Sequence, residues 1–154
     1  MRYQGVVRIE DEIKQKSFKS KKEKALVNLV FTYNWIKEKR SKTYKEFGLS
    51  SQQFNILRIL RGQHPNAASV KLLTERMLDK MSNASRLVDK LLEKELVDRH
   101  YCPNDRRQVD VLITKKGLNL INAASIKGDE LLKDFAITET EAATLSAILD
   151  KIRD

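Results

Sequence analysis

The stretch that decides the fold is residues 69–92, which read SVKLLTERMLDKMSNASRLVDKLL. Ser69 is a good helix N-cap, and the apolar residues after it repeat at the spacing of one helix face. A short helix is therefore expected from residue 70, followed by a turn over residues 78–81. A second helix is expected from Ser82, its N-cap, to about Glu95. Two helices joined by so short a turn predict a helix-turn-helix.

Two β-rich segments, Leu96–Tyr101 and Val109–Thr114, follow this pair of helices. The second alternates apolar and polar residues, as a half-buried strand does. The polar residues between them, Cys102–Gln108, are expected to form a hairpin loop. A helix-turn-helix followed by a two-stranded ribbon predicts a winged helix, an architecture used mainly to bind DNA.

Helical patterns flank this segment on both sides. Their apolar residues recur three and four positions apart, and Thr138 and Glu141 form a capping box before the last one. The expected helices cover residues 9–16, 20–40, 50–61 and 115–134, and a final helix after Thr138. The 154 residues therefore predict one domain that is mainly α with a small two-stranded β-wing, in the α+β class.

Charge is distributed unevenly along the chain. The formal net charge is +9, and residues 1–45 hold 13 Lys and Arg against 5 Asp and Glu. Residues 117–154 hold 4 against 7 and are acidic. A basic chain favours polyanions, although a basic segment also serves as a solvated, solubilising face. With one cysteine, no apolar segment of membrane-spanning length and no signal-peptide pattern, a cytoplasmic protein without membrane contact is expected.

The second helix of the helix-turn-helix has two chemically distinct faces. At about 100° per residue, Asn83, Arg86 and Lys90 share one side, and apolar residues occupy the other. Amide, guanidinium and ammonium groups can hydrogen-bond base edges in the major groove. Ser82 and Ser85 lie near the helix N-terminus and suit phosphate or base-edge contacts. The alternative is an ordinary solvated helix face.

The predicted hairpin loop carries a second candidate DNA contact. Arg106 and Arg107 at its tip would suit a minor groove, whose negative potential attracts guanidinium groups. Asp105 would hold one of these arginines in place by an ion pair. The alternative is a solvated turn, because Pro, Asn and Asp are common turn residues.

Residues 54–117 resemble the multiple antibiotic resistance regulator (MarR) family. The matching segments are Ser82–Leu91, Leu96–Arg99, Pro103–Arg107 and Leu112–Gly117. The resemblance implies a DNA-binding lobe at residues 46–116 and dimerisation helices at 9–45 and 117–152. It also implies a homodimer that binds a pseudo-palindromic operator, with recognition helices in major grooves and wings in minor grooves. Glu95 departs from the pattern, because the family often has Gly there to end the recognition helix.

The resemblance further implies a repressor that a small lipophilic or aromatic effector releases from DNA. Tyr33, Trp35 and Tyr44 are candidate walls of such an effector pocket, although aromatic residues at helical spacing are more often core or dimer interface. Cys102 is a candidate redox site at the base of the wing, with an inert small residue as the alternative. His100 and Cys102 alone are too few for a metal site, so neither a metal nor a cofactor is expected.

Other functional classes fit less well. The chain has no phosphate-binding glycine loop and no nucleophile motif, so an enzyme is not expected. An RNA-binding protein would need aromatic stacking platforms, which the polar elements lack. The remaining alternative is a winged-helix protein-assembly module with weak or lost DNA binding, and Asn83, Arg86, Lys90 and the wing arginines argue against it.

Overall fold

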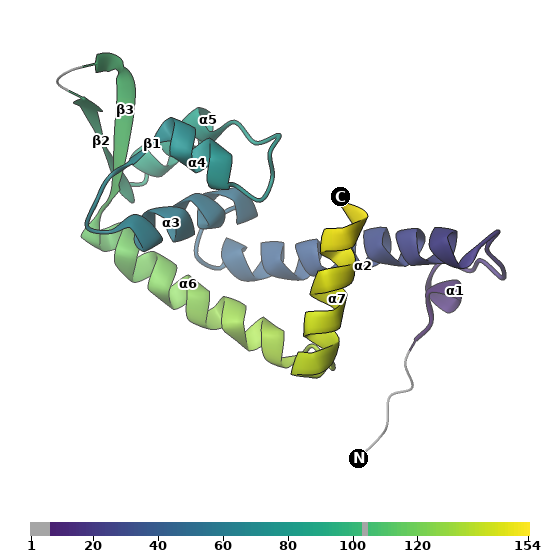
Figure 1. Cartoon of the computed structure of the whole chain (residues 1–154). Helices are drawn as coiled ribbons and strands as arrows, with labels where there is room; N and C mark the ends of the chain where they lie inside the picture. Colours follow the sequence, from purple (N-terminus) through teal and green to yellow (C-terminus); the bar gives the residue numbers. More distant parts are fainter. Residues whose placement is uncertain (1–6, 103–104) are drawn as a thin grey trace. The chain divides into compact units, whose positions relative to one another are not determined.

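The computed structural model describes residues 7–102 and 105–154, and the side chains of residues 101–108 lie outside this description. The chain forms two compact units, Met1–Lys42 and Thr43–Asp154. The described elements, labelled in Figure 1, are α1 (Ile9–Glu12), α2 (Lys21–Lys45), α3 (Ser51–Gln63), β1 (Ala68–Ser69), α4 (Val70–Arg76), α5 (Ala84–Leu92), β2 (Val97–Cys102), β3 (Asp105–Ile113), α6 (Lys115–Lys133) and α7 (Glu139–Ile152). Within the described residues, no helix is both long and apolar enough to cross a membrane.

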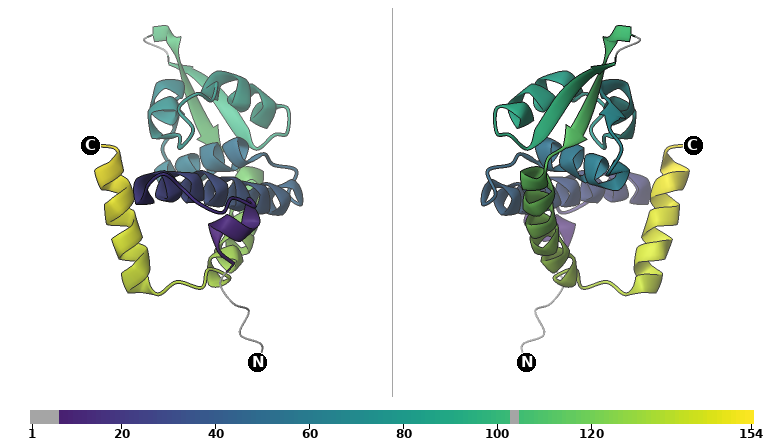
Figure 2. Two further views of the ribbon diagram at one scale, coloured as in Figure 1. Left: turned by 90° about the vertical axis from the view of Figure 1, so that its right-hand side faces the viewer. Right: turned by 90° about the vertical axis from the view of Figure 1, so that its left-hand side faces the viewer.

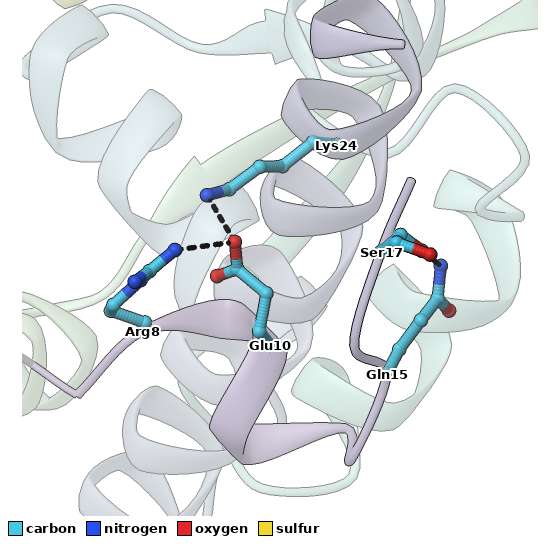
Figure 3. Close-up of polar contacts among 5 residues, drawn as sticks. All are labelled: Arg8, Glu10, Gln15, Ser17 and Lys24. Carbon is cyan, nitrogen blue, oxygen red and sulfur yellow. Dashed lines mark hydrogen bonds and ion pairs between the residues drawn. The ribbon is translucent and has the colours of Figure 1, made fainter. Parts of the chain in front are cut away.

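The first unit contains α1, most of α2 and an ion-pair cluster around Glu10 (Figure 3). Glu10 Oε1 accepts hydrogen bonds from Lys24 Nζ at 2.5 Å and from Arg8 Nη2 at 2.9 Å. The Glu10 side chain is only 16% exposed. The bond from Lys24 is the largest of the causes that lower the pKa of Glu10 from 4.5 to about 2. The cluster therefore ties α1 to the first turns of α2 through a charged carboxylate.

Glu10→Gln is expected to destabilise the protein near neutral pH and to have little effect near pH 2. A carboxyl group whose pKa is lowered by folding contributes stability above its unfolded value, 4.5, and loses it as the pH falls toward its folded value, about 2. The thermal midpoint difference between wild type and variant should therefore stay constant from about pH 7 to about pH 5 and shrink below that. A difference that persists unchanged down to about pH 3 would contradict this assignment.

The second unit is built around α3, which packs against α4, α5, α6 and β3. The hydroxyl of Ser50 caps α3 by accepting from Gln53 N at 3.1 Å, and the Gln53 side chain accepts from Ser50 N to complete a capping box. One face of the helix is fully buried because its apolar residues recur at helical spacing. The buried core of the unit comprises Tyr44, Leu49, Phe54, Ile56, Leu57, Ile59, Leu60, Ala68, Leu73, Met77, Ala84, Val88, Leu91, Leu96, Val97, Val111, Ile113, Ile121 and Ala124.

The sheet is antiparallel, with strand order β1-β3-β2. In register, Ala68 pairs with Val111, and Val97 pairs with Ile113. β2 and β3 extend beyond α4 and α5 as a hairpin in all three views (Figures 1 and 2). The expected helix-turn-helix and wing are therefore confirmed, and the sheet has one more strand than the two that were predicted.

Several predicted boundaries were wrong. α2 continues to Lys45, α3 passes Gly62 to end at Gln63, and α5 ends at Leu92, before the expected end near Glu95. The predicted loop 102–108 is also too long, because β2 reaches Cys102 and β3 begins at Asp105. Backbone pairing across the hairpin extends both strands into a segment without hydrophobic alternation.

Candidate nucleic-acid interface

The polar face of α5 lies opposite a buried apolar face. Ala84, Val88 and Leu91 are buried, as the helical periodicity predicted. The exposed side includes Asn83, Ser85, Arg86, Asp89 and Lys90, and Ser82 is half-buried in the turn before it. We call Asn83, Ser85, Arg86 and Lys90 the polar face of α5. The structure therefore leaves four of the five predicted recognition-helix residues exposed.

Asn83, and not Ser82, is the N-cap of α5. Its Oδ1 accepts a hydrogen bond from Arg86 N at 3.0 Å, so the prediction for Ser82 was wrong. The cap uses one acceptor site of the Asn83 amide and leaves its NH₂ group for other contacts. Asn83 therefore both fixes the start of the helix and lies at the end where the helix dipole favours anions.

An ion pair that the sequence did not reveal fixes α5 to the sheet. Arg99 Nη2 on β2 donates to Asp89 Oδ1 at 2.6 Å, and the Arg99 side chain is 24% exposed. The pair neutralises the carboxylate that lies among the polar face residues. Within the described part of the chain, neither the Arg86 guanidinium nor the Lys90 ammonium has an ion-pair partner. The exposed charge of this face is therefore positive, which suits a polyanion.

The turn before α5 is fixed by a buried amide. Asn55 on α3 is 6% exposed, and its Oδ1 accepts from Leu78 N at 2.9 Å. The turn is thus bonded to the central helix of the unit. In the sequence, Asn55 interrupts the apolar run 54–57. Its position is the signal that could have indicated this bond, because a buried amide needs a hydrogen-bond partner.

Three residues after the end of α5, Glu95 adopts a left-handed backbone conformation with a φ of 59°. Glu95 N donates to Leu92 O at 2.8 Å and Leu96 N donates to Leu91 O at 3.0 Å, which is the pattern of a Schellman motif. The chain thus forms the left-handed C-cap with a glutamate where glycine is favoured. Its carboxylate binds Lys116 Nζ at 2.7 Å, and this ammonium lowers the pKa of Glu95.

Glu95→Gly is expected to raise the free energy of unfolding by about 0.5–1 kcal/mol, because glycine adopts a positive φ without steric cost. The lost ion pair with Lys116 is exposed and screened by water, so its loss offsets little of this gain. Urea denaturation measures the change, and Glu95→Ala is the matched control that loses the same ion pair but keeps a Cβ. If both variants were equally destabilised, backbone strain at residue 95 would not be the cause.

The other predicted site residues are placed as follows. The side chains of Cys102, Asp105, Arg106 and Arg107 lie outside the described residues, so their expected roles stay predictions. Tyr44 is 2% exposed and stacks on Phe54 with ring centroids 3.9 Å apart, which places it in the core of the second unit.

The two remaining aromatic candidates belong to the first unit. Trp35 lines a small cavity of about 280 Å³, together with residues that include Phe31 and Asn28. Tyr33 is 59% exposed and is not among the residues that line this cavity. Among the described residues, no group of three His, Cys, Asp or Glu side chains is arranged to hold a metal ion.

Comparison with known proteins decides the family. Residues 49–109 match the model of the MarR family. The HTH-type transcriptional regulator MhqR of Bacillus subtilis (strain 168) is 30% identical over 127 residues, which cover 79% of this chain and 85% of that protein. This chain belongs to the MarR family. MarR proteins are transcription regulators.

Solved structures share the fold of this MarR-family chain at lower sequence identity. A MarR-like transcription regulator from Bacillus cereus ATCC 10987 is 22% identical with a TM-score of 0.75, over 86% of this chain and 95% of that one. MepR of S. aureus, in a complex with DNA, is 20% identical with a TM-score of 0.73, over 80% and 92%. BpsR of Bordetella bronchiseptica is 20% identical with a TM-score of 0.76, over 90% and 99%. The MarR-type winged-helix fold is thus shown from both sequence and structure.

Proposed function

We propose that this MarR-family protein is a cytoplasmic, sequence-specific regulator that binds double-stranded DNA as a homodimer and represses transcription. The observation that carries the proposal is the polar face of α5, where Arg86 and Lys90 are exposed without an ion-pair partner among the described residues. The Asp89–Arg99 pair holds this face in position on the sheet. MepR, which has the same fold, forms a complex with DNA and supports the assignment.

The base-reading role is assigned to Arg86, Asn83 and Lys90, whose groups can form paired or charged hydrogen bonds with purine edges. Ser82 and Ser85 lie at the positively polarised end of α5 and are assigned to phosphate or base-edge contacts. Arg106 and Arg107, with Asp105 as their support, stay proposed wing contacts on the basis of sequence.

Exposed apolar residues on α6 and α7 support the homodimer. α7 has no buried residue, and its Leu145, Ile148 and Ile152 are 49%, 52% and 63% exposed. On α6, Ile126 and Leu132 are 64% and 60% exposed. Apolar side chains gathered in this way mark an interaction surface, because leaving them in water is unfavourable. We propose that helices in residues 9–45 and 117–152 form the dimer, and that residues 46–116 form the DNA-binding lobe.

A small lipophilic or aromatic effector is proposed to regulate DNA binding. A groove of about 670 Å³ in the second unit is lined mainly by apolar atoms of residues that include Phe47, Leu96 and Leu120. The DNA binding of BpsR is regulated by 6-hydroxynicotinic acid, so this acid is the first probe. Weakened DNA binding in its presence, without a change in dimer mass, would support regulation of this kind.

The function is tested by selecting bound fragments from sheared genomic DNA with the full-length protein. One enriched sequence with two-fold symmetry is expected, and sedimentation should give the mass of a dimer on each fragment. Recovery of fragments without a common sequence would instead favour the protein-assembly alternative.

A further inference from the structure

The turn between α4 and α5 exposes two apolar side chains. Met81 is 94% exposed and Leu78 is 68% exposed. Covering a methionine removes unfavourable apolar surface from water, so such exposure beside a binding face indicates a contact surface. Among the residues that the structure describes, none covers Met81 to a large extent, because its side chain is 94% exposed.

The position of Met81 is fixed by hydrogen bonds of the turn. Met81 N donates to the Asp79 carboxylate at 3.1 Å, and Ser82 N donates to Asp79 O at 3.2 Å. The start of the turn is bonded to Asn55 through Leu78 N. Met81 is therefore presented by a defined backbone, two residues before the Asn83 cap of α5.

This location determines what Met81 can contact. The N-terminal residues of a recognition helix are those that approach base edges in the major groove. The C5 methyl of thymine is the apolar group on those edges, whereas the other edge groups are hydrogen-bond donors or acceptors. A thioether is flexible and polarisable, and it cannot satisfy a base donor or acceptor well.

We propose that Met81 contacts the C5 methyl group of a thymine in the major groove and thereby gives the DNA site a preference for thymine. The inference rests on the proposed function, since it needs α5 to enter DNA. It assigns specificity to a residue outside the polar face of α5.

The test replaces each thymine of one half-site by deoxyuridine, which removes only the methyl group. The DNA is the enriched genomic fragment, and dissociation constants of the full-length protein are measured by fluorescence anisotropy. At one thymine, the replacement is expected to weaken wild-type binding about 3- to 10-fold. Met81→Ala should bind both DNAs equally, whereas Met81→Leu should keep the thymine dependence. Leu78→Ala, which alters the other exposed apolar residue of the turn, should also keep it.

The proposal is overturned if wild type binds every deoxyuridine fragment as well as the parent DNA. It is also overturned if Met81→Ala retains the full loss at the same thymine. Circular dichroism confirms that the variants fold, which is expected because residue 81 is almost fully exposed. If wild type does not prefer the parent fragment over scrambled DNA, the proposed function itself fails and this inference falls with it.

Discussion

Gly117→Ala is expected to lower the free energy of unfolding by about 3 kcal/mol. A Cβ at residue 117 would lie 2.1 Å from Leu96 O and 2.9 Å from a side-chain carbon of Ile113. Leu96 O is a backbone atom, so the steric clash can be removed only if α6 or the junction between α5 and β2 moves. Urea denaturation of the purified protein measures the effect.

Gly62→Ala is the matched control, because a Cβ there meets nothing within 4 Å and residue 62 lies inside α3. This change is expected to be neutral or to stabilise by about 0.5–1 kcal/mol, since alanine favours helix more than glycine. Equal stability of Gly117→Ala and wild type would show that α6 does not pack on Leu96 as described.

Hydrogen bonds of Thr114 link the start of α6 to the residues that follow α5. Thr114 Oγ1 accepts from Gly117 N at 3.0 Å and donates to Glu95 O at 2.9 Å, and Thr114 N donates to Leu96 O at 3.1 Å. The start of a proposed dimerisation helix is therefore bonded to residues 95 and 96, which connect the proposed recognition helix to β2.

Arg86→Ala is expected to weaken binding to the specific DNA by at least about 30-fold. A good base contact contributes about 1–3 kcal/mol, and a homodimer makes each contact twice. Binding to scrambled DNA should fall much less, because there the guanidinium contributes only general attraction to phosphates. Anisotropy titrations with both DNAs at the same salt concentration give the two changes.

Arg153→Ala is the matched control for charge. It also removes one guanidinium, but Arg153 follows α7 and lies outside residues 46–116 of the proposed DNA-binding lobe and residues 9–45 and 117–152 of the proposed dimer. It should leave both affinities nearly unchanged. Should Arg86→Ala weaken binding to specific and scrambled DNA equally, Arg86 would contact phosphate and not read bases.

Local patterns in the sequence predicted the helix-turn-helix correctly. The burial of Val88 and Leu91 follows from helical periodicity. The helix caps at Ser69, Thr114 and Thr138 were also predictable, because each hydroxyl accepts a hydrogen bond from the backbone N–H three residues later. Such interactions are local and therefore visible in one sequence.

Interactions between distant residues account for what the sequence did not predict. β1 has two residues, too few for a pattern, and exists because Ala68 pairs with Val111. The Asp89–Arg99 pair and the Asn55 bond to the turn join different elements. Ser82 and Asn83 can both cap a helix, and local pattern alone does not distinguish them, whereas in the structure Asn83 is the cap.

The specificity ratio of the wild-type protein tests the central claim most directly. This ratio divides the dissociation constant for scrambled DNA by that for the enriched genomic fragment, and anisotropy measures it at several salt concentrations. We expect a ratio of about 10³ or more at physiological salt, with both affinities falling as salt rises. A ratio near one at every salt concentration would contradict DNA reading by α5 and would favour a winged helix used for protein assembly.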